Sequence, residues 1–160
     1  MSICHLSGLV GKLVRVNRGG PESSEGLVLV AKGDYIVVYV KHEGVVYYNL
    51  EHIKSITLLK KPFKHLNKHG HHREILWKHN KPHSFLEALR SKKNRLIKIN
   101  RGGPDSITGV LTSVHRDHIK LIDKEEPVII FTHHIKSFTP SLRLVNQLRT
   151  VQKAEKNDKK

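Results

Sequence analysis

The 160-residue sequence has little cysteine and no long apolar run. Its single cysteine, Cys4, excludes an intramolecular disulfide and a zinc-ribbon site, and leaves either a thiol or a disulfide to another chain. No apolar stretch approaches the roughly 20 residues that a membrane-spanning helix needs, so we expect no membrane insertion. The N-terminus lacks the basic start and long apolar segment of a secretory signal, so we also expect no signal peptide.

Acidic residues are scarce, with 14 Asp and Glu against 29 Lys and Arg, and none pairs with an evident catalytic base. Asp34 and Asp117 recur at expected hairpin turns, where Asp is favoured for local reasons. His52 and His134 also recur, but no recurring nucleophile and acid complete a triad around them. There is no Walker loop and no dinucleotide fingerprint. We therefore expect a protein that is not an enzyme and needs no cofactor.

The formal charge of +15 raises the question of nucleic acid. Most of the positive excess falls in residues 58–83 and 140–160, and the first third of the chain is nearly neutral. Aromatic residues, which stack on bases, make up only 6% of the sequence. Nucleic acid is therefore the less favoured partner, and the basic segments are better suited to acidic proteins.

One unusual stretch occurs twice: "VNRGGPESSEG" begins at Val16 and "INRGGPDSITG" begins at Ile99, 83 positions later. The similarity continues downstream, where the same four residue types, His-Ile-Lys-Ser, occur once in each copy. We conclude that one structural unit is present twice. These repeat-motif residues are His52, Ile53, Lys54 and Ser55 in the first copy and His134, Ile135, Lys136 and Ser137 in the second.

Each copy predicts five short strands separated by turn residues, which is typical of a small Sm-like or SH3-like barrel. A short helix is expected before each copy, near Ile3–Leu9 and near Ser84–Arg90, where Ser84 and Glu87 match a capping box. The predicted fold is therefore mostly β, with two tandem five-stranded barrels and a C-terminal helix. The expected strands are Lys12–Asn17, Glu25–Ala31, Tyr35–Lys41, Val45–Asn49 and Lys54–Leu59, then Arg95–Asn100, Thr108–His115, His118–Asp123, Val128–Thr132 and Ile135–Phe138.

The expected domain boundaries follow from the repeat. Residues 1–59 form the first β repeat, 60–83 a His- and Lys-rich linker, 84–139 the second β repeat, and 140–160 a short helix with a disordered basic tail. The helix is expected to start at Thr139-Pro140, a favourable helix entry.

The two glycine turns have two interpretations. Paired glycines permit positive φ and proline fixes φ, so each turn is first of all a shaped bend between two strands. The alternative is an anion-binding loop in which the arginines grip a ligand. The residues concerned are Arg18, Gly19, Gly20 and Pro21, and their repeats Arg101, Gly102, Gly103 and Pro104.

The copies differ on one face of the third strand. Tyr35, Val37 and Tyr39 are replaced in the second copy by His118, Lys120 and Ile122. An apolar outer face of this kind indicates a partner surface. We expect it to pack against the second unit or against another copy of the protein, so a homo-oligomer is one of the two outcomes.

The linker contains six of the thirteen histidines. Clustered imidazoles can bind zinc or nickel, but neither cysteines nor carboxylates complete a metal motif here. A solvated basic connector is the alternative. The candidate metal ligands are His65, His69, His71 and His72.

The stretch "VNRGGPESSEG" with "VVYYNLEHIKSIT", and the stretch "INRGGPDSITG" with "FTHHIKSF", resemble the spore coat protein B family of Bacillus-type endospore formers. The resemblance spans roughly residues 8–57 and 84–139. It implies a structural coat component that is made in the mother-cell cytoplasm, assembles on the forespore and has other spore coat proteins as partners. The chain departs from the family in lacking a long Ser/Lys-rich tail and in its His-rich linker. An Sm-like nucleic-acid binder that uses the basic loops and linker is the alternative function.

Overall fold

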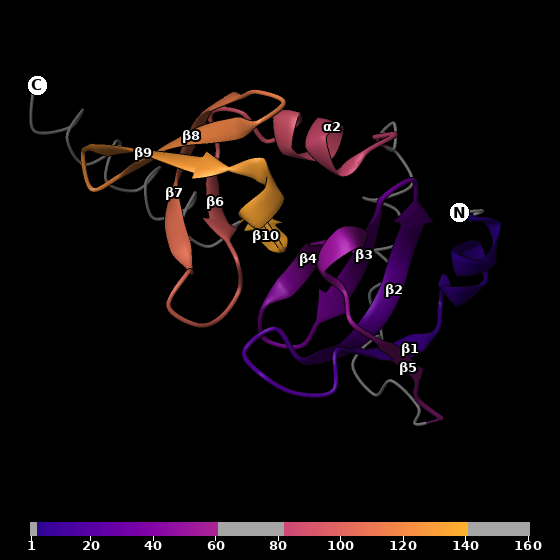
Figure 1. The fold of residues 1–160 in the computed structure, drawn as a ribbon. Coiled ribbons are helices and arrows are strands. Elements are labelled where there is room, and N and C mark those ends of the chain that lie inside the picture. The colour runs from indigo at the N-terminus through magenta and orange to yellow at the C-terminus, as the bar shows by residue number, and fades with distance from the viewer. Residues whose placement is uncertain (1–2, 61–81, 141–160) are drawn as a thin grey trace, which may run out of the picture.

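The computed structural model describes residues 3–60 and 82–140 and is mostly β, with two similar groups of short strands (Figure 1). The first group contains η1 (Ile3–Leu9), β1 (Leu13–Val16), β2 (Ser24–Lys32), β3 (Tyr35–Val40), β4 (Gly44–Asn49), η2 (Leu50–His52) and β5 (Ile56–Leu58). The second contains α2 (Phe85–Arg90), β6 (Leu96–Ile99), β7 (Ile107–Val114), β8 (His118–Asp123), β9 (Glu126–Phe131), η3 (Thr132–His134) and β10 (Ser137–Pro140).

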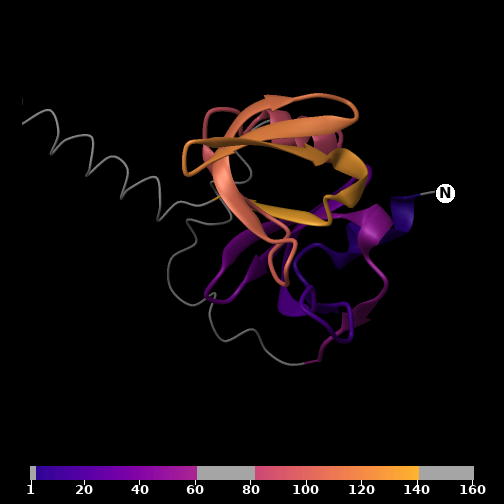
Figure 2. The same ribbon diagram turned by 60° about the vertical axis from the view of Figure 1, so that its left-hand side comes forward.

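All ten strands belong to one antiparallel sheet in the order β5-β1-β2-β3-β4-β10-β6-β7-β8-β9. Within each half the fifth strand pairs with the first, so the order of the first half is repeated in the second. The halves are joined where β4 pairs with β10, and β10 lies at the boundary between them (Figure 2). The sheet is open at β5 and β9, and the two separate barrels stay a prediction.

Alternating burial explains why the strands form where they do. In β1 and β6 every second residue is buried, as expected when one face of a short strand covers a core. Both β2 and β7 contain a register shift, at Val28/Val30 and at Leu111/Ser113. Such irregularities bend a strand and increase its twist, which lets five short strands wrap around a small core.

The two halves do not have equivalent cores. The first half buries its own cluster, which includes Ile36, Val38 and Tyr48. The core of the second half extends over the outer face of the first half, because the same cluster contains residues of both. Its members are Val30, Tyr35, Val37, Tyr47, Phe85, Ala88, Leu89, Ile97, Ile99, Leu111, Ile119, Leu121, Ile135 and Phe138.

The structure confirms the positions of the ten predicted strands, with most ends shifted by one or two residues. The expected helix entry at Thr139-Pro140 is wrong, because these residues continue β10 and pair with β6. Proline has no N–H to donate, but it is tolerated at a strand end. The first short helix is a 3₁₀ helix, not an α-helix. The candidate metal ligands and the remainder of the predicted C-terminal helix lie outside the described residues.

No helix in residues 3–60 or 82–140 is long and apolar enough to cross a membrane.

Candidate functional site: the junction between the two halves

The repeated motifs meet in each half through an asparagine. The Asn100 side-chain oxygen accepts hydrogen bonds from the backbone N–H groups of Lys136 (2.8 Å) and Ser137 (3.4 Å). Asn100 has φ +51°, a left-handed conformation that asparagine adopts more readily than most residues. The glycine turn and the His-Ile-Lys-Ser segment are therefore one structural unit. In the first half, Asn17 has φ +54° and accepts from Lys54 (2.8 Å) and Ser55 (3.4 Å) in the same way.

The rest of the His-Ile-Lys-Ser motif supports the core. In each half the histidine ends a 3₁₀ turn and the isoleucine follows it. Ile135 is fully buried in the larger cluster, and Ile53 packs against the smaller one. The Nε2 atom of His52 is buried without a hydrogen-bond partner, whereas His134 is exposed.

We expect Asn100→Ala to lower the free energy of unfolding by about 1–2 kcal/mol, because the N–H groups of Lys136 and Ser137 lose their acceptor. Alanine also adopts a positive φ less readily than asparagine does. Asn100→Gly removes the same hydrogen bonds but accepts the backbone angle, so it should be less destabilising. Urea unfolding followed by circular dichroism measures both variants. Equal losses would mean that backbone conformation contributes nothing at this position.

Aromatic side chains fill the junction where β4 meets β10. Phe138 stacks on Tyr47 with ring centroids 4.5 Å apart, and the tilted ring of Phe85 on α2 has its centroid 5.3 Å from that of Phe138. Phe138 is fully buried. Since Tyr47 belongs to the first half and Phe138 to the second, this stack joins the two halves.

The predicted partner face lies mostly inside this junction. Tyr35 and Val37 are each 1% exposed and belong to the shared cluster, while Tyr39 is partly buried. The Tyr35 hydroxyl donates to the Pro82 carbonyl oxygen at 2.6 Å, and burial raises the pKa of Tyr35 to about 12. Of the two alternatives for this face, packing against the second unit is what the structure contains.

The helix α2 is held to the first half by its N-terminus. Asp34 accepts a hydrogen bond from the Phe85 N–H at 2.7 Å. The Ser84 half of the predicted capping box is confirmed, because the Ser84 hydroxyl accepts from the Glu87 N–H; the Glu87 carboxylate accepts from the N–H of His83, one residue before the N-cap. Asp34 therefore has a long-range role besides its expected place in a turn.

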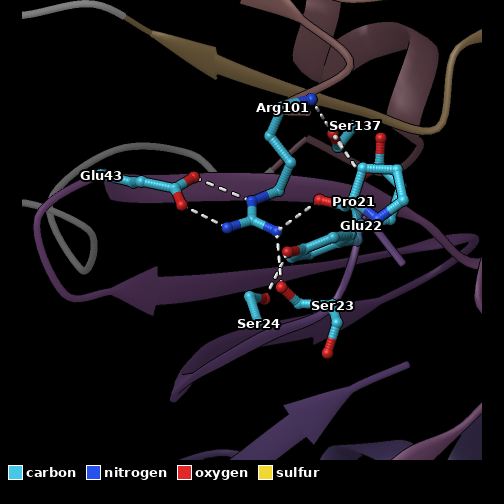
Figure 3. Close-up of polar contacts among 8 residues, drawn as sticks. Pro21, Glu22, Ser23, Ser24, Glu43, Arg101 and Ser137 are labelled. Carbon is cyan, nitrogen blue, oxygen red and sulfur yellow. Dashed lines mark hydrogen bonds and ion pairs between the residues drawn. The ribbon is translucent and has the colours of Figure 1, made fainter. Parts of the chain in front are cut away.

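Arg101 lies at the centre of the junction (Figure 3). Its guanidinium donates two hydrogen bonds to the Glu43 carboxylate and further ones to the carbonyl oxygens of Pro21 (3.3 Å) and Ser23 (2.9 Å). The Arg101 side chain is only 8% exposed. Arg101 thus binds an anion, but that anion is the carboxylate of the other half of the chain.

The two glycine turns touch each other here. A Cβ on Gly102 would lie 2.6 Å from the Pro21 carbonyl oxygen, so only glycine fits at this approach. Gly103 has φ +83° and a Cβ there would lie 3.3 Å from the Pro21 ring. The second turn packs on the first through its paired glycines.

Arg18, the counterpart of Arg101, has a different environment. It is exposed, and within the described residues no ion pair joins it to a carboxylate. The motif around both arginines is nearly identical, so the difference comes from the place of each turn in the sheet. The Arg101 side chain points into the first half and meets Glu43 there, whereas the Arg18 side chain is exposed and meets no such carboxylate among residues 3–60 and 82–140.

Glu22 is the least satisfied group of the junction. Its Oε2 accepts a 3.4 Å hydrogen bond from the Ser137 hydroxyl, and its Oε1 is buried without a partner. Burial raises the pKa of Glu22 above its usual 4.5, although Arg101 and Lys136 act in the opposite direction. The folded state therefore binds a proton more tightly than the unfolded chain does, and stability falls as the pH rises through this pKa.

Glu22→Gln should become more stable relative to the wild type as the pH rises from about 4 to 7, because the neutral amide avoids the burial of a charge. Urea unfolding at the two pH values measures the change. Asp105→Asn is the matched control, since Asp105 is the exposed repeat counterpart of Glu22. An advantage of Glu22→Gln that is the same at both pH values would contradict the pKa shift.

The sequence pointed to the arginines and the glycine turns but not to Asn17, Asn100, Glu22 or Glu43. The asparagines had a signal, because each precedes the repeated arginine in both copies. Glu43 had none, because it is a hairpin residue far from Arg101 in sequence. No group of three His, Cys, Asp or Glu suited to a metal ion occurs in residues 3–60 and 82–140.

Comparison with known proteins gives one informative similarity. The chain is 31% identical to spore coat protein B of Bacillus subtilis (strain 168) over 137 residues, which is 82% of the chain. It spans only 33% of the length of that relative. No family model matches the sequence.

Proposed function

We propose that the chain is a member of the spore coat protein B family and a non-enzymatic structural component of the endospore coat, which acts by protein–protein assembly. The observation that supports this most is the similarity to spore coat protein B over 82% of the chain. In this proposal the protein is synthesised in the mother-cell cytoplasm and its partners are other coat proteins.

The roles of the repeated residues support a structural function. Most of the motif residues that recur in sequence are used within the fold: Asn100 binds backbone N–H groups, Ile135 fills the core, and Arg101 joins the halves. The duplicated motifs build a scaffold with two open edges.

A fluorescent fusion of the chain, expressed in sporulating Bacillus subtilis, tests the proposal. We expect a fluorescent shell around the developing spore, and free fluorescent protein should stay diffuse as the control. A diffuse or nucleoid-associated signal for the fusion would contradict the coat role. Salt-dependent binding to DNA or RNA would then favour the nucleic-acid alternative, because phosphate contacts weaken as salt is added.

A further inference from the structure

The two ends of the sheet expose strand edges with large apolar side chains. At one end β5 exposes Leu58 (54%), and at the other β9 exposes Ile129 (56%) and Phe131 (54%). These ends lie far apart in Figure 1. Proteins usually protect such edges with charges, prolines or a covering segment, since an open edge pairs with another strand.

The pairing of β4 with β10 in the internal junction is a precedent for pairing between the two open edges. By the repeat, β9 is the counterpart of β4, and β5 is the counterpart of β10. In the junction Phe138 pairs with Tyr47. The corresponding residues at the open edges are Ile56 on β5 and Ile129 on β9. The two edge strands of the sheet, β5 and β9, are therefore the repeat counterparts of the two strands, β10 and β4, that pair at its centre.

The polar part of the junction also has counterparts at the open ends. Arg18 is the exposed counterpart of Arg101. The β8–β9 hairpin contains two exposed glutamates, Glu125 and Glu126, where the β3–β4 hairpin contains Glu43. Opposite charges therefore lie at the two ends, in the places where the internal ion pair would be repeated.

The second half has a hollow at the position that corresponds to the Arg101 site of the first half. In the second half, Pro104, Ser106 and Ile130 line an open hollow of about 560 Å³. Their counterparts in the first half are Pro21, Ser23 and Tyr48. Arg101 donates to the first two of these, and its charge acts on the third. The site that Arg101 occupies in the first half is thus open in the second half.

We propose that the partner for both edges is a second copy of this chain, with β5 of one copy adding to β9 of the next and Arg18 entering the hollow beside Glu125 and Glu126. The contact is heterologous, so it propagates from copy to copy. It should be weaker than the internal junction, because His118 and Lys120 replace Tyr35 and Val37 and there is no aromatic stack. This inference rests on the proposed role in coat assembly and names one partner.

Sedimentation velocity of the purified full chain over a range of concentrations, in about 0.15 M salt, tests the contact. We expect reversible association that Ile129→Lys and Leu58→Lys each weaken by at least about tenfold, because a charge on either edge opposes strand addition. Both side chains are exposed, so circular dichroism should show unchanged folding. A monomer at every concentration, or association that neither variant changes, would overturn the proposal.

Cross-linking tests the direction of the contact in a Cys4→Ser background. Ile56→Cys mixed with Ile129→Cys should give a disulfide-linked dimer, because these residues are the repeat counterparts of Phe138 and Tyr47, which lie opposite each other in the internal junction. Neither variant should cross-link by itself. Dimers of one variant alone would show that like edges meet and would overturn the head-to-tail arrangement.

Charge reversal tests the arginine. Arg18→Glu should weaken association, and adding Glu125→Arg with Glu126→Arg should restore part of it. Failure of any restoration would overturn the ion pair. A chain that surrounds the spore yet sediments as a monomer would overturn the edge contact alone. A chain that associates through its edges yet stays diffuse in the cell would overturn the coat role alone.

Discussion

Phe138→Ala is expected to lower the free energy of unfolding by about 3–5 kcal/mol, the usual range for removing a buried aromatic ring. Phe138 is fully buried and contacts the rings of Tyr47 and Phe85, and its strand pairs with both β4 and β6. The substitution therefore weakens the core of the second half and its contact with the first half together. Urea unfolding followed by circular dichroism measures the loss.

Phe131→Ala is the matched control, because it removes the same ring from a site that is 54% exposed. It should change stability by less than about 0.5 kcal/mol when measured at a concentration where the chain is a monomer. A loss below about 1 kcal/mol for Phe138→Ala would show that the ring at the junction is not packed as the structure has it.

Arg101→Ala is expected to lower the free energy of unfolding by about 2–4 kcal/mol. It leaves the Glu43 carboxylate and two backbone carbonyl oxygens without their donor in a mostly buried place. The figure lies below that of a fully buried pair because the Glu43 side chain is 38% exposed. The measurement is the same urea transition.

Arg18→Ala should change stability by less than about 0.5 kcal/mol, since Arg18 is exposed. The two arginines have almost the same neighbours in sequence, so the pair of variants separates the effect of the motif from that of its surroundings. Equal losses for both would contradict the assignment of Arg101 to the junction.

Much of the strand pattern could be predicted from the sequence because the signals are local. The alternation of Val14 with Val16 and of Ile97 with Ile99 defines a buried face within a few residues. The Ser84 and Glu87 pair likewise identifies the start of α2. The last strand begins and ends two residues later than predicted, because Ile135 closes a 3₁₀ turn and pairing with β6 draws Thr139 and Pro140 into the sheet.

The junction could not be predicted to the same degree, because its contacts join residues far apart in the chain. A sequence shows that the outer face of β3 is apolar, but not which of two partners covers it. Nor does it distinguish Arg18 from Arg101, whose local sequences agree. The difference depends on which half stands beside each turn, and that follows only from the order of strands in the sheet.

The pairing of β4 with β10 joins two halves of a single chain, so it is formed at a high effective concentration that dilution does not change. The outer edges have no such connection, and any contact between copies depends on how much protein is present. Dilution therefore separates the two kinds of junction. The urea transition, which depends on the internal junction, should not change with protein concentration, whereas association between copies should be lost on dilution.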